Sequence, residues 1–196
     1  MNKYLFFILL LFLSVNICAQ FEQGRLELSV SGSLGTFSNI YKSGDYISNS
    51  ESRFYFTTTL RTGFFIFDSF QIEPELFVYL VEKNLPTYSV NANLAYNFSF
   101  HKSNIKPFVL LGYGLGNSYP FLLSSGSLMR VKNEFDIGCI NAGVGVKTLV
   151  SENVAIRIEY RYQRYDYKEE KKSINSPGNE YVLNIHKVLF GVSFFL

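Results

Sequence analysis

Apolar and polar residues alternate with a period of two along most of this sequence. Between residues 25 and 34, for example, Leu26, Leu28 and Val30 alternate with Glu27 and Ser29. Successive side chains of a β-strand point to opposite faces, so this pattern predicts a strand with one apolar and one polar face. The same pattern recurs in seven further segments, at residues 53–64, 71–80, 88–100, 107–116, 135–146, 154–163 and 188–196. The sequence therefore predicts an all-β fold with eight strands.

The segment 135–146 changes phase part-way along. Its apolar residues are Ile137 and Cys139 in the first half and Val144 and Val146 in the second, and the two pairs fall on opposite phases of the alternation. One extra residue in a strand shifts the alternation in this way. We therefore expect a β-bulge between residues 139 and 142, with Ile137 and Cys139 on the same outer face as Val144.

The lengths of the segments and of their connections are typical of a membrane barrel. Strands of about ten residues span a bilayer when they are tilted. The connections alternate between short turns, at 68–69, 101–105 and 151–153, and longer loops, at 36–52, 82–87, 117–132 and 168–180. Outer-membrane barrels have short periplasmic turns and longer extracellular loops. The predicted fold is an eight-stranded antiparallel up-and-down transmembrane β-barrel.

A soluble up-and-down barrel would show the same alternation, because the period alone does not say which face points inward. Charged residues make up only 17% of the chain, equal to the aromatic fraction, whereas soluble domains carry about 25%. The apolar phase has almost no charge, and a charge that faces lipid costs about 2–4 kcal/mol at the bilayer midplane. Tyrosines lie near the predicted strand ends, where membrane barrels have aromatic girdles: Tyr88, Tyr113, Tyr160 and Tyr162. These features favour the membrane barrel.

Residues 1–19 have the pattern of a cleaved secretory signal. Lys3 precedes the apolar run 5–15, and we expect cleavage after the small residue Ala19. A lipoprotein signal acylated on Cys18 fits less well, because the bulky Ile17 precedes that cysteine. The barrel domain then spans residues 20–196 and reaches the outer membrane by Sec-dependent export. In that domain we interpret Cys139 as a small apolar residue rather than a nucleophile.

Several short runs resemble a known family. They are Ile-Glu-Pro-Glu-Leu at 72–76, Lys-Pro-Phe-Val-Leu-Leu-Gly at 106–112, Asp-Ile-Gly at 136–138 with Gly-Val-Gly-Val at 143–146, and Ile-Arg-Ile-Glu-Tyr-Arg-Tyr at 156–162. These runs are similar to the porin-family outer-membrane β-barrel domain common in Bacteroidetes, whose architecture resembles the OmpX and OmpA barrels. The resemblance implies a barrel over the whole mature chain, in the bacterial outer membrane, and points to no particular activity. One departure is the final Leu196, where such barrels usually end in Phe.

The predicted fold also sets the expected partners. A barrel of this kind contacts outer-membrane lipid and lipopolysaccharide and is assembled by the barrel-assembly machinery through its C-terminal strand, and we expect a monomer. A net charge of +2 without a long basic block gives no indication of nucleic-acid binding. The sequence shows no metal-ligand spacing, phosphate loop or dinucleotide fingerprint, so we expect no cofactor and no metal site.

The polar phase of the strands carries charges that we expect to point into the barrel. An eight-stranded barrel has an interior just wide enough for side chains to fill. Charges in such an interior must be paired, so a plug of salt bridges is expected. A narrow gated pore in which arginine and glutamate exchange partners is the alternative. The expected inward set has four residues of each sign: Arg25, Glu27, Arg61, Glu73, Glu75, Arg157, Glu159 and Arg161.

A lipid-modifying enzyme is a further alternative, since small barrels of similar fold include a lipid A deacylase and a palmitoyltransferase. Such chemistry needs a serine activated by a base. His101 lies on a predicted short turn. His186 lies near Asn184, and Ser173 and Ser176 precede it in a loop. No motif fixes a triad from these residues, so we expect a protein that is not an enzyme.

The long loops contain aromatic and apolar residues. Exposed apolar residues in loops can mark a surface that binds a partner. We therefore expect a structural role or adhesion and ligand binding through the loops, with packing between the loops as the alternative interpretation. The candidate binding residues are Tyr41, Tyr46, Tyr119 and Phe121.

Overall fold

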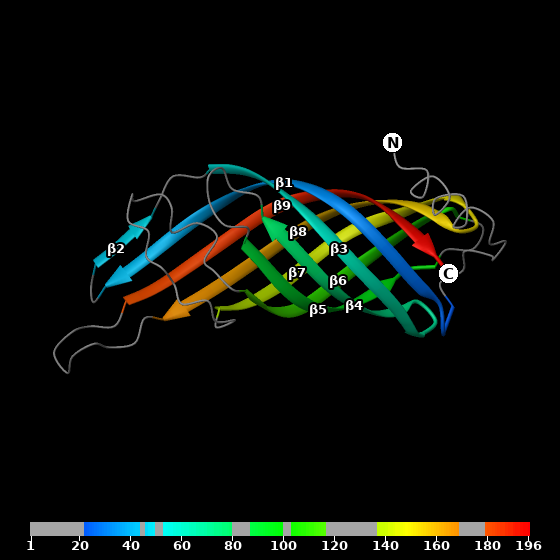
Figure 1. The fold of residues 1–196 in the computed structure, drawn as a ribbon, viewed down its shortest axis with the longest axis horizontal. Helices are drawn as coiled ribbons and strands as arrows, with labels where there is room; N and C mark the ends of the chain where they lie inside the picture. The colour runs from blue at the N-terminus through cyan, green and yellow to red at the C-terminus, as the bar shows by residue number, and fades with distance from the viewer. Residues whose placement is uncertain are drawn as a thin grey trace, which may run out of the picture.

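The computed structural model describes residues 22–43, 46–49, 53–79, 87–99, 103–116, 137–168 and 179–196. Within these residues the chain forms nine β-strands (Figure 1). They are β1 (Leu26–Ser43), β2 (Tyr46–Asn49), β3 (Arg53–Phe67), β4 (Phe70–Tyr79), β5 (Thr87–Asn97), β6 (Ile105–Gly116), β7 (Ile137–Ser151), β8 (Val154–Lys168) and β9 (Asn179–Phe195). In the same residues, no helix has the length and apolar character to cross a membrane. The signal predicted at 1–19 lies outside the described residues.

Eight of the strands form a closed antiparallel barrel. β1 and β3 to β9 pair in chain order, and β1 also pairs with β9, which closes the sheet. β2 is a short addition that pairs with the last residues of β1. Figure 1 shows the strands tilted about the long axis, with the end of β9 at one end of the barrel and β2 at the other. The predicted up-and-down barrel is confirmed. We call the two ends the turn end, where β9 ends, and the loop end, where β2 lies.

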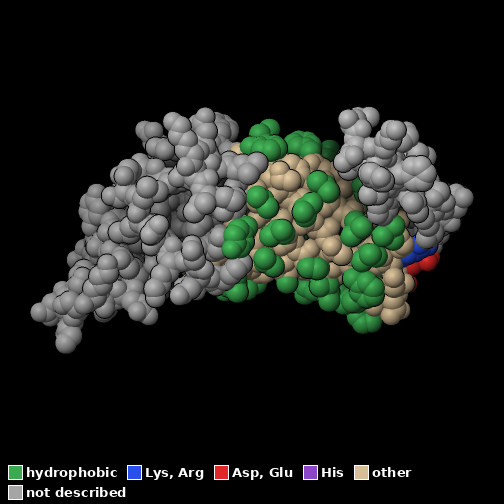
Figure 2. Space-filling model, in the orientation of Figure 1, with side chains coloured by type: hydrophobic (Ala, Val, Ile, Leu, Met, Phe, Trp, Pro, Cys, Tyr) green, Lys and Arg blue, Asp and Glu red, His purple; other side chains and the backbone are tan. Residues whose placement is uncertain are grey.

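The outer wall of the barrel is apolar. Leu34, Phe56, Leu111, Val144 and Phe190 are each more than half exposed, although they are large apolar side chains. Figure 2 shows hydrophobic side chains spread over the middle of the barrel, with charged side chains visible only at its edge. Exposed apolar surface on this scale marks a membrane or protein interaction surface. The alternation seen in the sequence thus separates an apolar outer wall from the barrel interior.

Exposed aromatic residues mark the two edges of the apolar wall. Tyr88, Tyr113 and Tyr160 are 38–57% exposed and lie toward the loop end, with the partly exposed Tyr162 beside them. Tyr96 is 44% exposed at the turn end and packs edge-on against the ring of Phe98, at 5.0 Å between centroids. Aromatic side chains at both edges are typical of the girdles that meet the membrane interfaces.

β1 and β9 continue well beyond the segments predicted from the sequence. They pair without interruption from Glu27↔Phe195 to Ser43↔Asn179, although residues 36–43 were expected in a loop and residues 179–187 outside the last strand. The outward positions of this extension are mixed: Thr36 and Ser38 are polar, whereas Ile40 and its partner Val182 are apolar. The regular apolar alternation therefore ends before the strands do. The strand pairing continues because backbone hydrogen bonds do not require apolar side chains.

The bulge expected in β7 is absent, and this prediction was wrong. The register with β6 and β8 is continuous from Gly138 to Thr148. Ile137 and Cys139 are fully buried and point inward, whereas Ile140 and Val144 are exposed on the outer wall. The apparent change of phase arises because the interior itself is apolar at the loop end. Register shifts occur instead beside two short turns, between Phe65 and Phe67 and between Leu149 and Ser151.

Candidate functional site

The middle of the barrel interior holds a cluster of buried charged residues, which we call the ionic cluster. Each of its members has a side chain no more than 1% exposed. They come from five strands because inward positions of neighbouring strands face one common space. The ionic cluster consists of Glu27 (β1), Arg61 (β3), Glu73 and Glu75 (β4), Lys147 (β7), and Arg157, Glu159 and Arg161 (β8).

Arg157 makes the most complete set of contacts in the ionic cluster. Its two terminal nitrogens donate to the two carboxylate oxygens of Glu73, at 2.8 and 3.0 Å. Its Nε donates to Glu159 Oε2 at 3.0 Å. The guanidinium also lies 4.2 Å from the ring centroid of Phe108. Paired hydrogen bonds of this kind are the strongest that a guanidinium makes with a carboxylate.

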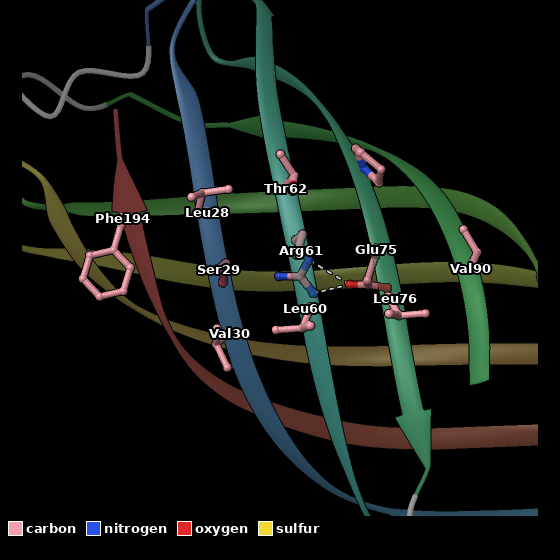
Figure 3. Close-up of a pocket in the computed structure, with 11 residues that line it drawn as sticks. Leu28, Ser29, Val30, Leu60, Arg61, Thr62, Glu75, Leu76, Val90 and Phe194 are labelled. Carbon is pink, nitrogen blue, oxygen red and sulfur yellow. Dashed lines mark hydrogen bonds and ion pairs between the residues drawn. The ribbon is translucent and has the colours of Figure 1, made fainter. Parts of the chain in front are cut away.

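The other cations connect the remaining carboxylates. Arg61 Nε donates to Glu75 Oε2 at 2.7 Å, and Arg161 Nη1 donates to Glu75 Oε1 at 2.5 Å. Lys147 Nζ donates to Glu27 Oε2 at 2.6 Å. Figure 3 shows Arg61 and Glu75 paired on the inner side of β3 and β4, and Leu60 and Leu76 beside them in the sequence lie on the opposite, outer side. Side chains that are adjacent in the sequence therefore point to opposite sides of the barrel wall.

Side-chain amides extend the ionic cluster across the barrel. Gln71 Nε2 donates to Glu27 Oε2 at 2.7 Å, and Asn141 Nδ2 donates to Asn91 Oδ1 at 3.1 Å. Gly114 faces this layer, and a Cβ atom there would overlap Asn91 Oδ1. The glycines of β6 thus make room for asparagines of β5, and the bulk of the amides occupies the space beside the charges.

Apolar layers close the interior on both sides of the ionic cluster. At the turn end, Phe65, Ala155 and Phe195 form a buried cluster. At the loop end the buried side chains include Ile137, Cys139, Tyr165, Leu183 and Ile185. Between these layers, Lys187 Nζ lies 3.3 Å from the ring centroid of Phe77. Side chains therefore fill the described part of the interior in successive layers.

The structure brings together seven of the eight charged residues expected in the interior. Arg25 is different, because it lies just before β1 at the turn end and is partly exposed. Two buried cations were missed, Lys147 and Lys187. Each lies one residue outside a segment predicted as a strand. Lys147 is two residues from Gly145 and Lys187 is two residues from Leu189, so extending the alternation by one residue would have placed both cations on the inward face. Among the described residues, five buried cations then face four buried carboxylates.

None of the other candidate residues belongs to the ionic cluster as the structure describes it. Tyr41 and Tyr46 belong to the pairing of β1 with β2 at the loop end. Tyr119 and Phe121 lie outside the described residues, as do His101, Ser173 and Ser176. His186 is exposed on the outer wall, where Nδ1 is 2.7 Å from the hydroxyl oxygen of Tyr160. Cys139 is a free, buried cysteine of the apolar layer, as its interpretation as a small apolar residue requires.

The barrel is closed and has an apolar wall, aromatic edges and a charged interior. A comparison of the sequence with known protein families agrees with this structure. The sequence matches the family described as outer membrane protein beta-barrel domain over residues 5–194. The chain belongs to this family. It is a β-barrel protein of the bacterial outer membrane. No curated protein sequence matches the chain.

Solved structures of outer-membrane barrels share the fold of this family member. Neisserial surface protein A is 14% identical, with a TM-score of 0.54 over 88% of this chain and 99% of that one. OprG from Pseudomonas aeruginosa is 11% identical, with a TM-score of 0.56 over 91% and 99% of the two chains. The N-terminal barrel domain of OprF from the same organism is 16% identical, with a TM-score of 0.51 over 89% and 98%. At these identities the likeness concerns the fold alone.

The family fixes the orientation of the barrel in the membrane. Outer-membrane barrels place their short turns in the periplasm and their longer loops outside the cell. The turn end therefore faces the periplasm, and the loop end, with β2 and the extensions of β1 and β9, faces the cell exterior. The ionic cluster lies at the depth of the apolar wall, where its charges are shielded from both lipid and water.

Proposed function

We propose that this outer-membrane barrel is sealed and acts through its extracellular surface, as a structural or binding protein rather than as a channel or an enzyme. The observation that carries the proposal is the filling of the interior by the ionic cluster and the apolar layers. An eight-stranded barrel has little room beyond its side chains. Function then falls to the loop end, where β1 and β9 extend beyond the apolar wall and display the connecting segments.

Bilayer recording tests whether the barrel is sealed. We expect the wild-type chain in a planar bilayer to show no steady conductance. A double variant with Glu75→Ala and Arg161→Ala removes a buried pair joined at 2.5 Å, and the space it leaves is expected to admit water and raise conductance several-fold over background. The exposed Leu111→Ala substitution is the matched control and should leave the barrel closed. Steady conductance of the wild-type chain would contradict a sealed interior.

A narrow gated pore is the second candidate function, and one observation favours it. Arg61 is shared among three carboxylates, with 2.7 Å to Glu75, 3.4 Å to Glu159 and 3.5 Å to Glu73. A cation with several partners can exchange them without becoming unpaired. In the same recordings, a pore of this kind would give steady conductance with the wild-type chain. The Glu75→Gln variant would show a different conductance.

An adhesion assay tests binding through the loops. Replacing Tyr119, Phe121, Leu122 and Leu123 by serine removes the apolar groups of the segment between β6 and β7. We expect cells that display this variant to adhere at least about threefold less to a hydrophobic or protein-coated surface, because apolar burial stabilises such contacts. Replacing Lys171 and Lys172 by serine between β8 and β9 is the control. Equal adhesion of both variants and the wild type at equal surface levels would argue against the loops as the binding element.

The proposal of a non-enzymatic role is supported by the surroundings of His186. Its ring lies between Tyr160 and Tyr162, with centroids 6.3 and 5.1 Å away, and Nδ1 is engaged with the phenol of Tyr160. A catalytic histidine needs a nucleophile and an orienting group in hydrogen-bond reach. Turnover of labelled lipopolysaccharide or phospholipid that is lost in His186→Ala would overturn this part of the proposal.

A further inference from the structure

The outer wall changes character where β8, β9 and β1 leave the apolar band. These three strands are neighbours in the sheet and run side by side far toward the loop end (Figure 1). One row across them holds exposed Leu34, Val188 and Tyr160, and the next two rows toward the loop end are polar. We call these two rows the outer-wall patch: Thr36, His186 and Tyr162 in one row, and Ser38, Asn184 and Arg164 in the other.

Hydrogen bonds and ring contacts hold the outer-wall patch in one arrangement. The Tyr162 hydroxyl donates to Asn184 Oδ1 at 2.7 Å, and the ring of Tyr162 lies 5.1 Å from that of His186. Tyr160 lies below and is hydrogen-bonded to His186 Nδ1 at 2.7 Å. Since the side chains stand on paired strands rather than on a loop, little ordering is needed when a ligand binds.

The patch has little net charge. Arg164 Nε and Nη2 donate to the Asp166 carboxylate at 3.0–3.1 Å, and both side chains remain more than 40% exposed. The cation is therefore largely neutralised, while its planar donors still border the patch. A surface of this composition recognises a ligand by hydrogen bonds and by contact with ring faces rather than by charge.

The depth of the patch identifies what faces it. Phe190 is 54% exposed on the wall two rows below the patch, at the level of lipid tails. Tyrosine rings such as Tyr160 mark the interface of the membrane. The patch begins one row farther toward the cell exterior, so it meets the head groups of the outer leaflet. In an outer membrane these head groups are the saccharides of a glycolipid.

We propose that the outer-wall patch binds the saccharide head group of lipopolysaccharide in the surrounding outer leaflet. The rings of Tyr162 and His186 would contact the apolar faces of a sugar, and the polar groups of Thr36, Ser38 and Asn184 would bind its hydroxyls. Arg164 and Asp166 lie at the edge of the patch nearest the loop end, where they offer planar hydrogen-bond donors and acceptors. The lipid-facing wall is continuous with the patch, so one lipid molecule can contact both. This proposal is independent of any binding by the loops.

Lipid retention measures this interaction. The full chain is extracted from outer membranes in mild detergent, washed, and assayed for lipopolysaccharide retained per folded chain. A triple variant with Tyr162→Phe, Asn184→Leu and His186→Leu removes the polar groups and keeps comparable bulk. Loss of two or more hydrogen bonds is expected to lower retention about tenfold. The control with Tyr88→Phe and Tyr96→Phe removes two exposed phenols elsewhere on the wall and should retain as much as the wild type.

Two further measurements keep the result interpretable. Slower or faster migration of unboiled samples on a gel shows that each variant has folded into a barrel, and only folded chains are compared. Washing with about 0.5 M NaCl screens exposed charges, and retention by the wild type should change by less than about twofold. Equal retention by the folded triple variant and the wild type would overturn the proposal. Loss of retention in salt would overturn it as well, because recognition would then depend on phosphate charge.

Discussion

Replacing Arg157 by methionine is expected to lower the free energy of unfolding by about 3–5 kcal/mol. The substitution removes two hydrogen bonds to Glu73 and one to Glu159, and leaves both carboxylates buried. A buried charge without its partner is far more costly than the pair is favourable. Urea unfolding of the barrel in lipid vesicles, followed by the mobility of unboiled samples, measures the change.

A control for this prediction lies on the same strand. Arg164 is also paired with a carboxylate, but its side chain is 48% exposed, whereas that of Arg157 is 1% exposed. Arg164→Met should therefore cost at most about 1 kcal/mol, as exposed ion pairs usually do. Adding Glu73→Met to Arg157→Met should recover much of the loss, because an apolar pair can replace a buried ion pair. Equal losses for Arg157→Met and Arg164→Met would mean that the ionic cluster is reached by water.

The part of the fold that lies in lipid could be predicted from the sequence. Lipid excludes charge from the outward positions of a strand and favours apolar residues there, so positions such as Leu60, Leu94 and Val144 reveal both the strand and its phase. All three are exposed on the outer wall, as the alternation indicates. Outside the lipid there is no such restriction. The outward Thr36 and Asn184 are polar, so the sequence did not indicate that β1 and β9 continue through them.

The interior was harder to predict because it does not have to be polar. Ile137 and Cys139 point inward into an apolar layer, and their position in β7 looked like a change of phase. Pairing inside the barrel is harder still. Lys147 and Glu27 are 120 residues apart in the sequence and meet at 2.6 Å only because the sheet closes with a particular stagger. Charge and parity indicated seven of the eight members of the ionic cluster, all but Lys147, but not which of them form pairs.

Replacing Leu111 by arginine tests whether lipid covers the outer wall. Leu111 is 66% exposed in the middle of β6, between Leu94 of β5 and Ala142 of β7. An arginine at the bilayer midplane costs about 2–4 kcal/mol, whereas one near the interface costs about 0–1 kcal/mol. We therefore expect a large loss of stability in lipid vesicles for Leu111→Arg and a small one for Ile105→Arg, which is 51% exposed at the turn end of the same strand.

The depth dependence carries the information in this experiment. Leu111 and Ile105 are both exposed aliphatic residues of β6. Their strand propensities and their burial in the protein therefore differ little. A wall that faced water would accept arginine at either position with a change within about 0.5 kcal/mol. Unequal losses that grow toward the middle of β6 require a low-dielectric layer outside the barrel. Equal and small losses would instead require water along the whole wall, in conflict with a transmembrane barrel.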